Sequence, residues 1–191
     1  PRSTLFPYTT LFRSTVQEGA ALYNTTHFIK VEGSRAVSDR KSNLWDTEKA
    51  AITPGSAVSV FPTAFGRVGL IICWDLSFPP LFTAMNAQGV ELVISPTYWS
   101  FTVPSGEVKS VKEDEVLLID SLCTARAFEN NIVLAYCNAA GALKVPGMDA
   151  VLSGRSQVTH PVSKVVAQAE GNSEQMLMAT VDLVHKGPAT G

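Results

Sequence analysis

The sequence predicts a layered α/β fold, and three neighbouring stretches indicate it. Apolar residues 67–72 favour a buried strand, and residues 78–88 favour a helix with prolines at its first turn. That helix is expected to end at Gly89, and apolar residues 91–96 favour a second buried strand. A strand, a helix and a strand in succession are typical of layered α/β proteins.

The stretch before this unit predicts a hairpin and a loop. Residues 16–31 have a strand-like pattern that ends in a turn, and residues 36–40 fit the returning strand. A charged loop follows at residues 39–45, and Thr53-Pro54-Gly55 predicts a turn. Residues 58–61 then favour a strand that is joined to the strand at 67–72 by a turn at Phe65-Gly66.

The remaining chain predicts one long helix among strands and loops. An aromatic loop at residues 97–109 fits a pocket wall, and residues 112–130 favour a helix with one apolar face. Residues 131–137 favour a strand and residues 141–147 a loop. Three antiparallel strands are expected at 151–160, 164–169 and 175–183.

Composition and charge limit the classes of function. The 191 residues are 46% hydrophobic and 17% charged, which fits one soluble globular domain with its own core. A net charge of −2 gives no general attraction to nucleic acid or acidic membranes. No apolar run approaches the roughly 20 residues of a membrane span. Three widely spaced cysteines predict neither a disulfide framework nor a zinc site, so we expect a cytoplasmic location.

The first fourteen residues have neither helical nor strand periodicity, and they lack the apolar stretch of a signal peptide. They resemble a translated sequencing-adapter read. We therefore interpret residues 1–14 as a non-native leader and residues 15–191 as a partial domain. The competing interpretation is a genuine disordered tail.

Cys73 is the strongest candidate for chemistry in the chain. It follows a buried strand directly and precedes a helix, a setting that favours a thiolate. The alternative is a small buried core residue. Other familiar sites are excluded because the sequence lacks a phosphate loop, a dinucleotide glycine motif and a serine elbow, and because its three histidines are far apart.

Two charged residues in the loop after the predicted hairpin could support a cysteine nucleophile. The ammonium group of Lys41 could favour the thiolate and later stabilise an oxyanion. Glu48 could orient Lys41 or a substrate amine. Taken alone, each of these residues also fits a solvated loop.

Seven stretches in a fixed order carry a family resemblance. They are 22–25 (LYNT), 40–45 (RKSNLW), 53–55 (TPG), 65–75 (FGRVGLIICWD), 96–99 (PTYW), 124–130 (TARAFEN) and 154–156 (GRS). Through them the chain resembles the carbon–nitrogen hydrolase family, the nitrilase superfamily. The resemblance covers residues 15–183, and its cysteine and Arg-Ala-x-Glu-Asn motifs are the most specific.

The resemblance implies an α-β-β-α sandwich of the nitrilase type and a set of site residues. Cys73 matches the nucleophile and Lys41 the catalytic lysine. Glu48 matches a supporting glutamate, and the backbone N–H of Trp74 is expected to complete the oxyanion hole. Asn43 stands where family patterns often have a histidine.

Two further groups of residues receive expected roles. Tyr98 and Trp99 are expected to line the substrate pocket, although aromatic residues there also fit simple packing. Arg126, Glu129 and Asn130 match a helix motif that we interpret as structural, holding the cysteine loop.

The chain departs from the family upstream. The family's general-base glutamate lies near the end of an early strand, and residues 1–21 offer only Glu18, in the wrong context. We therefore expect the first strands, their helices and the base to be absent from this chain.

Three functions remain open at this point. The leading hypothesis is hydrolysis of a non-peptide carbon–nitrogen bond in a small amide or nitrile through a cysteine thioester, without metal or cofactor. The second is an inactive fragment or binding module, which would expose a sheet edge. The third is acyl transfer to an amine. The resemblance also implies a homo-oligomer.

Overall fold

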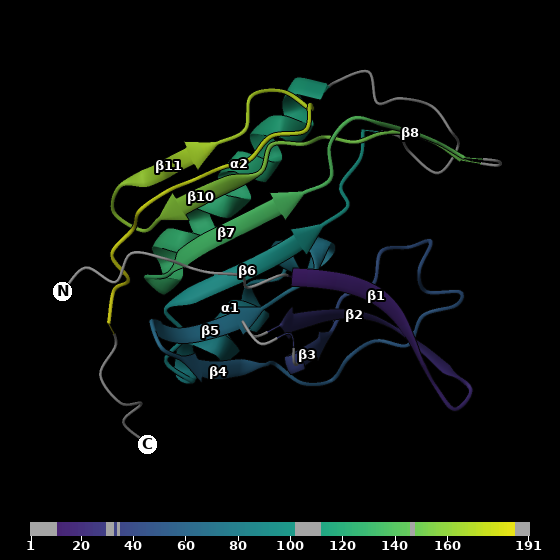
Figure 1. The fold of residues 1–191 in the computed structure, drawn as a ribbon, viewed down its shortest axis with the longest axis horizontal. Coiled ribbons are helices and arrows are strands. Elements are labelled where there is room, and N and C mark those ends of the chain that lie inside the picture. The colour runs from purple at the N-terminus through teal and green to yellow at the C-terminus, as the bar shows by residue number, and fades with distance from the viewer. Residues whose placement is uncertain (1–10, 30–32, 34, 102–111, 146–147, 186–191) are drawn as a thin grey trace.

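The computed structural model describes residues 11–29, 33, 35–101, 112–145 and 148–185 (Figure 1). Its elements follow one another in this order: β1 (Leu11–Glu18), β2 (Ala21–Ile29), β3 (Arg35–Arg40), β4 (Val60–Thr63), β5 (Gly66–Leu70), the 3₁₀ helix η1 (Cys73–Ser77), α1 (Pro79–Ala87), β6 (Leu92–Thr97), α2 (Lys112–Asn130), β7 (Val133–Asn138), β8 (Ala142–Val145), β9 (Met148–Val151), β10 (Gln157–His160) and β11 (Lys164–Gln168).

A six-stranded mixed sheet forms the centre of the fold, in the order β11-β10-β7-β6-β5-β4. Strands β5, β6 and β7 run parallel, because α1 and α2 return the chain between them. The outer strands β4, β10 and β11 pair antiparallel with their neighbours. The expected layered α/β fold is confirmed.

The central strands are buried on both faces, so alternate side chains serve two cores. On β7, Val133 belongs to one apolar cluster, whereas Leu134 and Tyr136 belong to the other. The second of these clusters also contains Phe82 of α1 and Ile119 of α2. Both helices therefore pack on the same face of the sheet, as Figure 1 shows.

A three-stranded antiparallel sheet, β1-β2-β3, covers part of the other face. Phe28 of β2 shares an apolar cluster with Val68, Leu70, Leu92 and Val133 of the central sheet. The described residues thus form three layers: two helices, the six-stranded sheet and the smaller sheet. Strand β3 leads directly into the loop that carries Lys41, so this packing positions one side of the candidate site.

The structure corrects the predictions for the N-terminal region. Residues 16–31 do not form one strand, because a turn at Gly19, with φ +60°, divides them into β1 and β2. Strand β1 begins at Leu11, and its Ser14 pairs with Thr25. The non-native origin of residues 1–14 stays a prediction. Backbone pairing with β2 needs no apolar periodicity, which is why residues 11–14 gave no strand signal.

Three predictions for the C-terminal region are wrong. Residues 151–160 do not form one strand, because β9 ends at Val151 and β10 begins only at Gln157. Residues 142–145 form β8, which pairs with β9, where a loop was expected. Residues 175–183 form no strand, although Val181 and Leu183 pack against the central sheet while Met176 and Met178 are exposed. The alternating pattern there arises from packing on a sheet face and not from strand pairing.

Some predictions fall outside the described residues. The aromatic loop expected at 97–109 is described only through Phe101, the turn expected at 32–34 only at Gly33, and the leader 1–14 only from Leu11. None of the helices in the described part of the chain is long and apolar enough to cross a membrane.

Two leucine substitutions test the position of the core. Leu134 is 0% exposed between the sheet and the helices, whereas Leu117 on α2 is 65% exposed. We expect Leu134→Ala to lower the free energy of unfolding by about 2–5 kcal/mol, because it leaves a cavity. Leu117→Ala should change it by less than about 0.5 kcal/mol, as is usual for surface substitutions. Urea denaturation measures both, and equal effects would contradict this packing.

Candidate active site

Cys73 lies on a strained turn at the end of β5. The backbone N–H of Ile71 still bonds the carbonyl of Ile94 at 3.1 Å, and Cys73 then adopts φ +51° as the first residue of η1. A left-handed conformation costs a cysteine roughly 1–3 kcal/mol, and such strain is concentrated at functional sites. The half-buried thiol donates a 3.7 Å hydrogen bond to the carbonyl of Tyr98.

Lys41 begins the loop that follows β3, and its backbone is fixed on both sides. Its N–H bonds the carbonyl of Asn24, and its carbonyl accepts the N–H of Gly55, each at 2.8 Å. The side chain is 2% exposed, and its ammonium group forms an ion pair with Glu48. A buried ammonium group needs such a partner, because losing hydration is costly.

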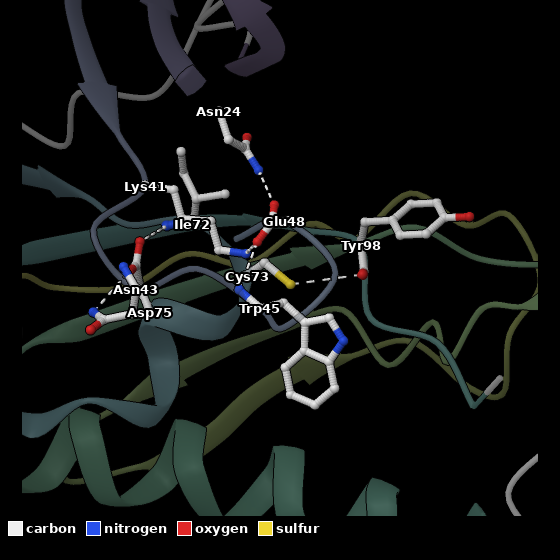
Figure 2. A network of polar contacts seen from close by, with 9 residues as sticks. All are labelled: Asn24, Lys41, Asn43, Trp45, Glu48, Ile72, Cys73, Asp75 and Tyr98. Carbon is white, nitrogen blue, oxygen red and sulfur yellow. Dashed lines mark hydrogen bonds and ion pairs between the residues drawn. The ribbon is translucent and has the colours of Figure 1, made fainter. Parts of the chain in front are cut away.

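Glu48 is itself held by two further donors. Asn24 Nδ2 donates to Oε1 at 2.7 Å, and the Trp45 N–H donates to Oε2 at 2.8 Å. Burial alone would raise the pKa of Glu48, but the hydrogen bonds from Lys41, Trp45 and Asn24 and the charge of Lys41 hold it below its usual value. Figure 2 shows this network beside Cys73.

The buried carboxylate of Asp75 joins the two halves of the site. It accepts hydrogen bonds from Asn43 in the lysine loop and from the Ile72 N–H, directly before Cys73 (Figure 2). Burial raises the pKa of Asp75, although these bonds and the nearby Lys41 oppose the change. In the sequence, Asp75 ends the cysteine motif at residues 65–75, but no role was predicted for it.

The helix α2 supports the cysteine turn from the other side. Arg126, largely buried, donates from Nε to the carbonyl of Leu76 at 3.2 Å and from a terminal nitrogen to that of Ser77 at 3.5 Å. Glu129 pairs with Arg126 at 3.0 Å, and Asn130 donates to the Arg126 carbonyl at 3.0 Å. The Arg126 bonds fasten α2 to the last turn of η1, whereas the contacts of Glu129 and Asn130 stay within α2.

A hollow of about 440 Å³ opens beside the turn. It is lined by Ser42, Asn43, Leu44, Trp45, Asp46, Lys49, Pro54, Trp74 and Phe78. Trp45 and Trp74 meet edge to face within it, with ring centroids 4.5 Å apart. The loop after β3 and the cysteine turn therefore form its walls together.

Tyr98 and Trp99 do not line this hollow. Tyr98 contributes its backbone carbonyl to Cys73. Trp99 is buried, packs on Trp74 with centroids 5.4 Å apart, and donates from its indole nitrogen to Glu115 of α2 at 2.9 Å. Their expected contact with substrate stays a prediction.

The other cysteines are separate from this arrangement. Cys123 is buried in α2, and burial raises the pKa of its thiol far above the usual value. Cys137 is exposed on β7. No disulfide joins any of the three. Within the described ranges, His, Cys, Asp and Glu side chains form no group of three that could hold a metal ion.

Comparison with known proteins identifies the family. Residues 8–188 match the family model described as carbon–nitrogen hydrolase. The chain belongs to the carbon–nitrogen hydrolase family. It is 32% identical over 164 residues to a protein of Schizosaccharomyces pombe named probable nitrilase, an alignment that covers 85% of this chain and 54% of that protein.

Further relatives in the family are amidases. The omega-amidase of Xenopus tropicalis is 27% identical, with 87% of this chain and 58% of the relative covered. The N-carbamoylputrescine amidase of Arabidopsis thaliana is 29% identical, with 87% and 57% covered. The chain thus spans a little more than half the length of the curated relatives it matches.

Solved structures of the family have the same fold. An amidase from Nesterenkonia sp. AN1 superposes with a TM-score of 0.68 at 28% identity, covering 85% of this chain and 56% of the amidase. In that structure the acetamide moiety of fluoroacetamide is attached covalently to the active-site cysteine. A carbon–nitrogen hydrolase from Helicobacter pylori G27 superposes with a TM-score of 0.82 at 24% identity, covering 93% and 62%.

One further buried carboxylate near the site was missed in the sequence. Asp39 was predicted at the overlap of the returning strand 36–40 and the charged loop 39–45; it lies on β3 opposite Thr26, and its burial was not foreseen. Burial raises the pKa of Asp39 to about 7, opposed by hydrogen bonds from Ser59 and increased by the charge of Asp75. The period of two along residues 35–40 was the available signal, because Val37 and Asp39 share a face.

The raised pKa of Asp39 predicts a pH dependence of stability. Between about pH 4 and the folded value of about 7, the folded state keeps a proton that the unfolded chain releases. The stabilising contribution is therefore complete below about pH 4 and is lost as the pH rises through about 7. We expect Asp39→Asn to flatten the fall in the free energy of unfolding across this range.

Urea denaturation at a series of pH values measures this slope. The exposed Asp114 of α2 offers a matched control, and Asp114→Asn should keep the wild-type slope. If the free energy of unfolding of Asp39→Asn falls with pH as steeply as that of the wild type, the raised pKa of Asp39 is not its cause.

Proposed function

We propose that the protein hydrolyses a non-peptide carbon–nitrogen bond in a small amide, or in a nitrile, with Cys73 as the nucleophile. The observation that carries this proposal is the buried Lys41–Glu48 ion pair, which the Asp75 bonds connect to a cysteine on a strained turn. A lysine in a solvated loop would be exposed, whereas the side chain of Lys41 is 2% exposed. Its partner Glu48 is also fixed by hydrogen bonds from Asn24 and Trp45, which a solvated ion pair would not require.

For an amide, the Cys73 thiolate attacks the carbonyl carbon and forms a tetrahedral oxyanion. The carbon–nitrogen bond then breaks, ammonia or an amine leaves with a proton, and a thioester remains on Cys73. Water attacks the thioester, releases the acid and restores the thiol. Proton transfers in both halves need a general base, which the family resemblance assigns to a glutamate upstream of the matching stretches.

Two groups are suited to stabilise the oxyanion. Lys41 supplies a fixed positive charge, and its pairing with Glu48 keeps the ammonium group in place. Trp74 is the second residue of η1, where a backbone N–H has no acceptor within the helix. The negative Glu48 also balances the lysine charge, so the site does not bury an isolated ion.

Most of the relatives described above are amidases, although the Schizosaccharomyces pombe protein is named probable nitrilase. The matched amidase from Nesterenkonia sp. AN1 is described both with fluoroacetamide-derived acetamide on its cysteine and, as a cysteine variant, with butyramide. Omega-amidases are also among the relatives. A short aliphatic amide is therefore the first substrate to test.

Substitution of the nucleophile and of the lysine tests the mechanism. In protein made from the complete gene, we expect Cys73→Ala to abolish ammonia release from butyramide, because no thioester can form. Lys41→Gln should lower kcat by about 100-fold or more, the usual effect of losing an oxyanion-stabilising group. A coupled ammonia assay measures both.

The exposed Cys137 provides the matched control, and Cys137→Ser should retain wild-type turnover. Ammonia release that persists in Cys73→Ala would refute the mechanism. Adding a primary amine distinguishes hydrolysis from acyl transfer: free acid as the main product supports a hydrolase, whereas a new amide would favour a transferase.

A further inference from the structure

The Asp75 carboxylate forms hydrogen bonds on both sides of the candidate site. Its Oδ2 accepts the N–H of Ile72 at 3.0 Å. Its Oδ1 accepts both the N–H of Asn43 at 2.7 Å and the Nδ2 of the same residue at 2.9 Å. Ile72 directly precedes Cys73, and Asn43 lies two residues after Lys41.

Only part of this arrangement is needed to form the turn. A carboxylate at the third position of a helix commonly accepts the N–H of the residue before the helix, and the bond to Ile72 is of this kind. The other oxygen reaches a residue 32 positions earlier and takes two of its donors. Two donors from one residue fix both the position and the orientation of that backbone.

We propose that Asp75 is a positioning residue that sets the place of the Lys41 ammonium group relative to the Cys73 thiol. It acts through Asn43 on one side and Ile72 on the other, and it does not itself touch the reacting atoms. This inference rests on the proposed function, because it gives these two groups a common reaction.

The surroundings of Asp75 suit a fixed connection. The side chain is 1% exposed, so water does not compete for its oxygens. Lys41 and Asp39 are the charged groups that act on it, with opposite signs. A buried acceptor that loses its partners bears the full cost of desolvation, so both sides of the connection are held together.

The other contacts between the lysine loop and the cysteine turn are less directional than this connection. Trp45 and Trp74 also join the lysine loop to the cysteine turn, but apolar packing tolerates sliding that hydrogen bonds do not. Arg126 bonds the carbonyls of Leu76 and Ser77, at the end of η1 away from Cys73. Asn43 supplies the second donor at the position where family patterns often have histidine.

The test compares Asp75→Asn, Asn43→Ala and the exposed control Asp114→Asn, all in a Cys137→Ser background that removes the exposed thiol. Asp75→Asn keeps the size but replaces one acceptor with a donor, which opposes one of the N–H groups. Asn43→Ala removes the Nδ2 bond and leaves the backbone bond. Proteins made from the complete gene are used throughout.

Two readouts are measured below the melting temperature of each variant. The first is the rate of Cys73 alkylation by iodoacetamide as a function of pH, followed by mass spectrometry. The second is kcat and KM for butyramide. We expect Asp75→Asn to move the alkylation profile to higher pH, because Lys41 no longer supports the thiolate.

For turnover, we expect kcat in Asp75→Asn to fall about 100-fold, the scale of a displacement of about 1 Å at a reacting group. KM should change by less than about threefold, since bound substrate is contacted by other groups. Asn43→Ala should change both readouts in the same direction by a smaller factor. Asp114→Asn should match the background protein.

A folded Asp75→Asn with an unchanged alkylation profile and kcat overturns the inference, even if its melting temperature falls. If Asp75→Asn does not fold, the same two readouts on Asn43→Ala decide the question.

The alkylation profile needs no substrate. Failure of the background protein to release ammonia would therefore overturn the proposed function alone and leave the positioning role decided by the thiol.

Discussion

The burial of one positive charge shapes the whole site. Lys41 is almost fully enclosed, so its ammonium group needs a carboxylate, and Glu48 in turn needs donors from Asn24 and Trp45. Asn24 belongs to β2, so the requirement reaches into the small sheet. The charge is thus compensated by contacts that also fix the loop to the small sheet.

The cysteine turn is held by a second set of contacts, of which only Asp75 also reaches the lysine loop. Strand β5 delivers the chain between two apolar clusters, Asp75 fixes the start of η1, and Arg126 fixes its end from α2. Strain at Cys73 persists because these contacts determine the turn on both sides. The two halves of the site therefore come from different layers, and Asn43 with Asp75 lies where they meet.

Local patterns in the sequence predicted the parts of the fold that depend on neighbours along the chain. The strand, the cysteine turn and the helix after it follow from one apolar run and two prolines, and α2 follows from its apolar face. Contacts between distant residues left no such pattern: Asn43 and Asp75 are 32 positions apart, and Asp39 turned inward only because of its hairpin register. Residues 175–183 were wrongly predicted as a strand, because alternating apolar residues occur both in paired strands and in a segment that packs on the face of a sheet.

Lys41 and Glu48 belong to one loop, whose ends are joined where the Gly55 N–H meets the Lys41 carbonyl. Gly55 lies so close to Arg40 that a Cβ there would clash with its backbone. The ring is therefore closed at its base, while Asn24 of β2 holds the charged pair inside it from outside the loop. Any residue with a side chain at position 55 would therefore push against Arg40 and force this ring open where the Lys41 carbonyl is held.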